Sequence, residues 1–99
     1  MRLVQWSDVR AQARVVFHGV VQGVNFRANC RGRALQGGLT GWVRNLEDGS
    51  LEALFEGSRE EVEGVIAWNR TSQPHAQVSE VHVSWSEPAD EFRTFEILR

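Results

Sequence analysis

Cysteine, lysine and long apolar runs are scarce or missing in this sequence of 99 residues, and each absence excludes a class of function. The single cysteine, Cys30, excludes disulfides within the chain and Cys-x-x-Cys metal or redox sites. Because none of the 11 basic residues is a lysine, Schiff-base chemistry and a P-loop lysine are excluded too. No apolar run approaches the roughly 20 residues that span a bilayer, so we expect no membrane association. Without a secretory signal, we expect a cytoplasmic protein.

The charged residues are unevenly distributed along the chain. Residues 1–44 carry seven arginines and one acidic residue, whereas residues 45–99 carry four arginines and twelve acidic residues. The net charge is −2, while nucleic-acid-binding domains usually have a net basic surface. The pattern therefore favours a small anionic ligand over a nucleic acid, with arginine forks as the groups that bind phosphate or carboxylate.

The first half of the sequence predicts a strand, a loop and a helix. Residues 14–18 are β-branched and aromatic, which is typical of a strand, and residues 19–25 form a glycine-containing loop. Apolar residues recur at every fourth position from Phe26, so we predict a helix over residues 26–36 with Asn25 as its N-cap.

The second half continues with four more strands, a turn and a second helix. The expected elements are a hairpin of strands 39–45 and 51–56, a helix over 58–70, and strands over 81–86 and 95–98. Residues 1–12 match neither period and are expected to form an N-terminal extension. Residues 13–99 are then one domain, long enough to fold around its own core.

This order of elements favours an α+β, ferredoxin-like (split βαβ) sandwich. We expect a mainly antiparallel sheet of four to five strands with both helices on one face. Right-handed crossover makes the first and second strands parallel, with the third between them. The loop of residues 19–25 and Asn45 then lie at the same end of the sheet as the N-terminus of the first helix.

That helix N-terminus is a candidate anion site. Its unpaired N–H groups and dipole favour a phosphate, Gly19 and Gly23 permit a close backbone approach, and Arg27 in the first turn can add a bidentate fork. The glycine spacing fits neither the dinucleotide fingerprint nor the P-loop. On physical grounds alone, a tight strand-to-helix turn with surface arginines explains the pattern equally well.

Two segments, in matching order and spacing, closely resemble the signature of the acylphosphatase family. They are VFHGVVQGVNFR at residues 16–27 and GWVRN at residues 41–45, followed by Asp48-Gly49. The resemblance covers nearly the whole chain from Arg14. It implies hydrolysis of acyl phosphates, which are carboxyl-phosphate anhydrides, to carboxylate and inorganic phosphate without a metal or cofactor. We therefore expect a monomeric hydrolase whose partners are a small acyl phosphate substrate and inorganic phosphate as product and inhibitor.

The same resemblance assigns the site residues. It implies that Arg27 binds the phosphoryl group together with the loop amides and that Asn45 positions the attacking water. The implied phosphate loop consists of Gly19, Val20, Val21, Gln22, Gly23, Val24, Asn25 and Phe26. Four positions depart from the usual family pattern, namely Val20, Asn29, Cys30 and Gly37. Cys30 stands where threonine is usual. Because a thiol forms weaker hydrogen bonds than a hydroxyl, we expect this difference to affect the rate of turnover and not the type of reaction.

Other interpretations stay open beside this one. A non-catalytic or accessory anion-binding module of the same fold, as in the N-terminal part of hydrogenase-maturation carbamoyltransferases, would use the same residues. His18 is a conceivable base, although a structural role at the strand end is favoured. His75 and His82 share no metal-ligand spacing with an acidic residue or another histidine, so no metal site is expected. Cys30 lies on the apolar helix face, where we expect a buried thiol.

Arginines in the C-terminal half of the first helix and at the end of the chain give two further expectations. Arg31 and Arg33 are interpreted as solvated helix charges that suit the dipole. The last strand runs back toward the phosphate loop, so the Arg99 carboxylate is expected near that loop, with Arg27 as the candidate for an ion pair.

Overall fold

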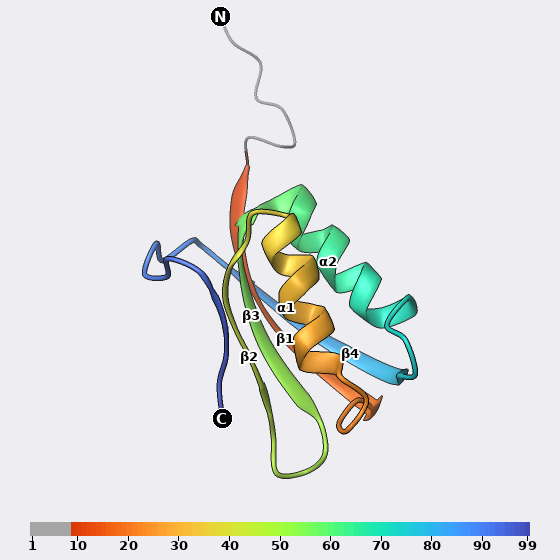
Figure 1. Cartoon of the computed structure of the whole chain (residues 1–99). Coiled ribbons are helices and arrows are strands. Elements are labelled where there is room, and N and C mark those ends of the chain that lie inside the picture. The colour runs from red at the N-terminus through yellow and green to blue at the C-terminus, as the bar shows by residue number, and fades with distance from the viewer. Residues whose placement is uncertain (1–8) are drawn as a thin grey trace, which may run out of the picture.

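The computed structural model describes residues 9–99 as two helices and five strands. The elements are β1 (Arg10–Val20), α1 (Phe26–Gln36), β2 (Thr40–Asn45), β3 (Leu51–Ser58), α2 (Arg59–Thr71), β4 (Gln77–Ser86) and β5 (Phe95–Ile97). The strands form one sheet in the order β4-β1-β3-β2-β5, and Figure 1 shows both helices on the same face of it. None of the helices in residues 9–99 has the length and apolar character needed to cross a membrane.

The strand connections confirm the predicted ferredoxin-like topology. β3 pairs antiparallel with both β1 and β2, so β1 and β2 are parallel with β3 between them. β5 adds to the outer side of β2 in parallel, which makes the sheet mixed. As a result, the C-terminal ends of β1 and β2 lie at one end of the sheet, together with the start of α1.

Three strands are longer than the sequence predicted, and one of them is β3, which ends at Ser58, two residues late. β1 begins at Arg10, four residues early, and ends at Val20, two residues late, while β4 begins at Gln77 and not at residue 81. The early start of β1 has only a weak signal in the sequence, because its inward residues are alanines, although Ala11 and Ala13 are buried. Residues 10–12 of the predicted extension are therefore part of β1, whereas residues 1–8 of that extension lie outside the described residues.

The core lies between the helices and the inner face of the sheet. α1 contributes the face that its periodicity predicted, with the buried residues Phe26, Cys30 and Ala34. α2 begins at the predicted cap, where the Ser58 hydroxyl accepts a hydrogen bond of 3.1 Å from the Glu61 N–H. This packing holds the N-terminus of α1 at the end of the sheet where β1 and β2 terminate.

Candidate active site

One cavity of about 370 Å³ lies at that end of the sheet. It is formed by the β1–α1 loop, the first turn of α1, the end of β2 and the C-terminal segment. Its lining residues are Val21, Gly23, Asn25, Phe26, Arg27, Ala28, Asn45, Ile97 and Arg99. The two segments that carry the sequence signature, about 18 residues apart between Arg27 and Asn45, therefore face one space.

The backbone of the β1–α1 loop is shaped so that its N–H groups are left without protein partners. Gly23 and Asn25 both have left-handed conformations, with φ of 75° and 63°. Asn25 precedes α1 as predicted, but its side chain makes no capping hydrogen bond. Within residues 9–99, the N–H groups of Phe26, Arg27 and Ala28 have no hydrogen-bond acceptor, whereas the Asn29 N–H already donates to the Asn25 carbonyl oxygen. The result is a group of amide donors at the positive end of the helix dipole, which favours an anion.

The charged side chains that line the cavity are all basic. Its lining contains two arginines, Arg27 and Arg99, and no acidic side chain. Arg27 is partly buried, and in the described part of the chain no hydrogen bond or ion pair engages its guanidinium. The first turn of α1 also carries no acidic residue. A half-buried cation without a protein counter-ion next to helix amides is suited to an anionic ligand.

Six of the ten residues assigned to the site from the sequence line the cavity, and four do not. Those that line it are Val21, Gly23, Asn25, Phe26, Arg27 and Asn45; Gly19, Val20, Gln22 and Val24 lie outside the lining. Gly19 and Val20 belong to β1, and the β1–β4 register shifts at His18/Gly19. A Cβ on Gly19 would lie 2.1 Å from the Gln77 carbonyl oxygen, so glycine is required there by the strand pairing.

Gln22 and Val24 support the loop from behind. The Gln22 side-chain amide donates hydrogen bonds to the backbone oxygens of Leu46 and Ser50, at 2.8 and 2.9 Å. Val24 packs against the core. The β2–β3 turn, whose carbonyl oxygens accept these bonds, is stabilised in turn because the Asp48 side chain accepts a hydrogen bond of 2.9 Å from the Ser50 N–H. Gln22 thus couples the loop to the segment that follows Asn45.

Ala28 and Ile97 line the cavity but were not assigned to it from the sequence. Ala28 lies in the first turn of α1, so the predicted anion site at the helix N-terminus already pointed to its position. No sequence motif near Ile97 indicates that this residue lines the cavity. Arg31 is exposed, which agrees with its interpretation as a solvated charge, and its Nε also donates a hydrogen bond of 3.0 Å to the Phe95 carbonyl oxygen. This contact fixes β5 against α1 and brings Arg99 to the cavity, as predicted. The expected ion pair between Arg99 and Arg27 is absent from residues 9–99.

Two other candidate nucleophiles or bases lie away from the cavity. Cys30 is fully buried, and burial raises the pKa of its thiol far above the usual value despite a hydrogen bond with Asn69 that lowers it. A thiol that stays protonated is a poor nucleophile. His18 lies on the outer face of the sheet and does not line the cavity. Neither group is placed to attack a ligand bound at Arg27.

Comparison with known proteins agrees with this architecture. The chain is 49% identical over 88 residues to a curated acylphosphatase from Roseiflexus sp., covering 89% of this chain and 95% of the relative. The crystal structure of acylphosphatase from Bacillus subtilis superposes with a TM-score of 0.86 at 30% identity, covering 90% of this chain and 99% of that one. A ferredoxin-like α+β sandwich with a cavity at the start of its first helix is therefore the class to which this protein belongs.

The particular family follows from the sequence. The acylphosphatase family model matches residues 13–97, and the chain belongs to the acylphosphatase family, whose members are hydrolases acting on small acyl phosphates. The structure of full-length HypF in a phosphate- and nucleotide-bound form is also similar, with a TM-score of 0.77 and 28% identity over 90% of this chain. Because the match covers only 12% of HypF, it concerns one segment of a much larger protein.

Proposed function

We propose that this chain hydrolyses acyl phosphates to a carboxylate and inorganic phosphate at the cavity of Arg27 and Asn45. The observation that carries the proposal is the convergence of an arginine without a protein counter-ion, the unpaired amides of α1 and the Asn45 amide on one small space. Phosphoryl transfer spreads negative charge over the equatorial oxygens of the transition state. Fixed amide dipoles and a guanidinium fork stabilise that charge without reorganising.

Asn45 has a different role in this proposal. It lies across the cavity from the β1–α1 loop, at the end of a different strand, and within residues 9–99 its side chain makes no hydrogen bond. Its side chain accepts a hydrogen bond from water and donates one to it, which orients the water for attack on phosphorus. An amide is not a base, so the proton of the water passes to a phosphate oxygen of the substrate.

The chemistry needs no general acid. The bond between phosphorus and the bridging oxygen breaks as the water oxygen attaches, and the leaving group is a carboxylate, which departs without protonation. The lack of acidic side chains in the cavity lining is consistent with this route. Negative side chains there would repel the phosphoryl group.

The remaining proposals follow from the same site. The phosphate loop comprises residues 19–26, with the cavity-lining members in contact with the ligand and the others supporting them. Inorganic phosphate, which keeps the group bound by Arg27, inhibits competitively. The active unit includes all of β1 and therefore extends over residues 10–99, acting as a cytoplasmic monomer.

The second candidate is an accessory anion-binding module, which the similarity to one segment of HypF favours. Both functions use the same cavity, but only the enzyme releases phosphate. Coverage of 95% of the Roseiflexus relative by this chain supports the enzyme.

Hydrolysis of benzoyl phosphate in the presence of excess EDTA separates the two. We expect turnover well above spontaneous decay, and competitive inhibition by inorganic phosphate. Folded protein that binds phosphate without accelerating the decay would establish the accessory module and overturn the proposal.

A further inference from the structure

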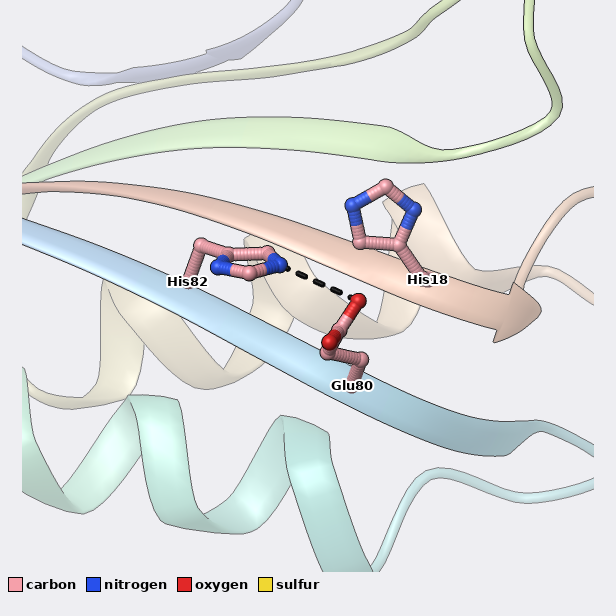
Figure 2. Close-up of side chains that lie close together, drawn as sticks. All are labelled: His18, Glu80 and His82. Atoms are coloured by element: carbon pink, nitrogen blue, oxygen red, sulfur yellow. Dashed lines mark ion pairs between the residues drawn. The ribbon is translucent and has the colours of Figure 1, made fainter.

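The outer face of the sheet, away from the helices, carries a group of three side chains that the active site does not use. His18 projects from β1, and Glu80 and His82 project from the neighbouring edge strand β4 (Figure 2). One ligand atom from each residue lies within 4.8 Å of the other two. Sequence spacing concealed this group, because β1 and β4 are separated by about 60 residues and only their pairing brings the histidines together.

The strand register fixes the positions of all three residues. His18 lies directly opposite Glu80, and His82 lies two residues further along β4, diagonal to His18. Directly opposed and diagonal partners on one face of an antiparallel pair are within side-chain reach. Phe17 and Val81, which alternate with them, point instead to the helix side, where Phe17 is fully buried. The backbone positions of His18, Glu80 and His82 are therefore fixed by the β1–β4 pairing and not by contacts between their side chains.

The side chains already approach a coordinating arrangement. His82 Nε2 lies 3.1 Å from Glu80 Oε2, and the imidazole rings of His18 and His82 lie edge to face with centroids 5.4 Å apart. In a tetrahedral zinc site, ligand atoms about 2.0–2.1 Å from the metal are separated from each other by about 3.3 Å. The largest separation here must shorten by about 1.5 Å, which rotation of exposed side chains achieves because Glu80 and His82 are 62% and 60% exposed.

We propose that His18, Glu80 and His82 bind one divalent first-row transition cation on the outer face of the β1–β4 pair. Two imidazole nitrogens and one carboxylate oxygen form a donor set typical of Zn²⁺, with the fourth position open to water. The nearest arginine of β1 on this face, Arg14, is engaged by Glu52, so it does not occupy the group. This proposal departs from the expectation, based on sequence spacing, that His82 has no metal-binding role.

The position of this site indicates a structural role. It joins β1 to an edge strand directly before the register shift at His18/Gly19, where the phosphate loop begins. None of its residues lines the active-site cavity, so the cation takes no part in hydrolysis. A ligand that binds only the folded chain stabilises it, and this one would stabilise the strand pair beneath the loop.

The test is calorimetric titration of the tag-free full chain with ZnCl₂ in a buffer that contains neither phosphate nor chelator. We expect one Zn²⁺ per chain with a Kd of about 10 μM or tighter. Zn²⁺ at about a hundredfold excess over Kd should raise Tm by roughly 10 °C or more. Mg²⁺, which prefers oxygen ligands, should do neither.

His82→Ala is the decisive variant, because an exposed side chain on an edge strand is removed without disturbing the core. Its Zn²⁺ affinity should fall at least about tenfold, and Glu80→Gln and His18→Ala should show losses of that order. His75→Ala, which removes the remaining histidine, is the matched control and should bind as the parent chain does. Equal affinity in folded His82→Ala, an equal loss in His75→Ala, or binding only at millimolar Zn²⁺ would overturn the proposal.

Discussion

The side-chain amide nitrogen of Gln22 lies 2.8 Å from the carbonyl oxygen of Leu46, and the same nitrogen lies 2.9 Å from the carbonyl oxygen of Ser50. A single side chain of the β1–α1 loop is thereby attached to both ends of the β2–β3 turn. Asn45 immediately precedes that turn. The bond therefore sets the distance between the phosphate-binding amides and the residue proposed to orient water.

Gln22→Ala should release this attachment and lower kcat by about 10- to 100-fold, because a displacement of about 1 Å between reacting groups has effects of that size. KM should change less, since Arg27 and the helix amides remain. Steady-state kinetics with benzoyl phosphate measure both quantities. Gln36→Ala, at the far end of α1, is the matched control and should keep the parent values. Parent kcat in folded Gln22→Ala would show that the turn needs no such support.

Arg27→Ala should impair both substrate binding and turnover. Its guanidinium contacts the phosphoryl group in the ground state and more strongly as charge develops, and losing one such donor commonly costs about 10²- to 10³-fold in rate. We expect kcat to fall by about that factor, with KM and the inhibition constant for phosphate both raised. Arg33→Ala, which removes a partly exposed arginine from the last turn of the same helix, is the control. An unchanged inhibition constant would contradict phosphate binding by Arg27.

Asn45→Ala should separate turnover from binding. An interaction made only with the attacking water lowers kcat without changing ground-state affinity, so we expect a loss of about 10²- to 10³-fold in kcat with a nearly unchanged inhibition constant for phosphate. Circular dichroism must first show that the variant is folded, because Asn45 ends β2 at the turn. Parent kcat in folded Asn45→Ala would assign the water to another group.

Glu52 should make stability depend on acidic pH. Burial by itself raises the pKa of this carboxyl, but hydrogen bonds from Arg44 and Arg14 outweigh it, and the pKa lies below its ordinary value. The resulting stabilisation is complete above the pKa of the unfolded chain, about 4.3, and is lost as pH falls through the lower folded pKa. Urea unfolding of Glu52→Gln should therefore show a shallower decline of the unfolding free energy below about pH 4 than the parent.

The same variant should also lose stability near neutral pH. Glu52 is 3% exposed, whereas Arg14 and Arg44 are 60% and 43% exposed. Water therefore partly replaces the ion pairs that the arginines lose, and we expect the free energy of unfolding to fall by about 1–2 kcal/mol. Glu47→Gln, in the exposed turn, is the control and should stay within about 0.5 kcal/mol of the parent. Identical pH dependence of the parent and Glu52→Gln would contradict the role of Glu52.

The C-terminal residues should contribute to the site in two separable ways. The Leu98 N–H donates a hydrogen bond of 2.9 Å to the Val43 carbonyl oxygen, while Arg99 lines the cavity. Deleting Arg99 alone should raise KM a few-fold with Tm nearly unchanged, because it removes the Arg99 guanidinium from the cavity lining and keeps the Leu98 hydrogen bond. Deleting Leu98 and Arg99 should lower Tm as well, by roughly 4–8 °C for a loss of about 1 kcal/mol. Parent KM in both truncated chains would show that the terminus does not contact substrate.

Local sequence was sufficient to predict the order of the elements and the position of β3 between parallel β1 and β2, although not every strand boundary. Periodicity from Phe26 located α1, the Ser58 cap located α2, and the handedness of crossover connections determined that β1 and β2 are parallel. These rules act over a few residues or follow from backbone chirality, so they hold whatever the rest of the chain does. These rules also predicted that Arg27 and Asn45 come together. Arg27 follows the end of β1, Asn45 lies at the end of β2, and the ends of two parallel strands lie at the same end of the sheet.

Tertiary structure alone decided which side chains meet across the sheet and between layers. The group of His18, Glu80 and His82 depends on the register between β1 and β4, and that register is set by pairing over many residues and shifted at His18/Gly19. The bond from Arg31 to Phe95 likewise depends on how β5 docks beside β2. No local periodicity encodes these distances, because moving one strand by a single residue would leave its own pattern intact while turning every side chain to the opposite face.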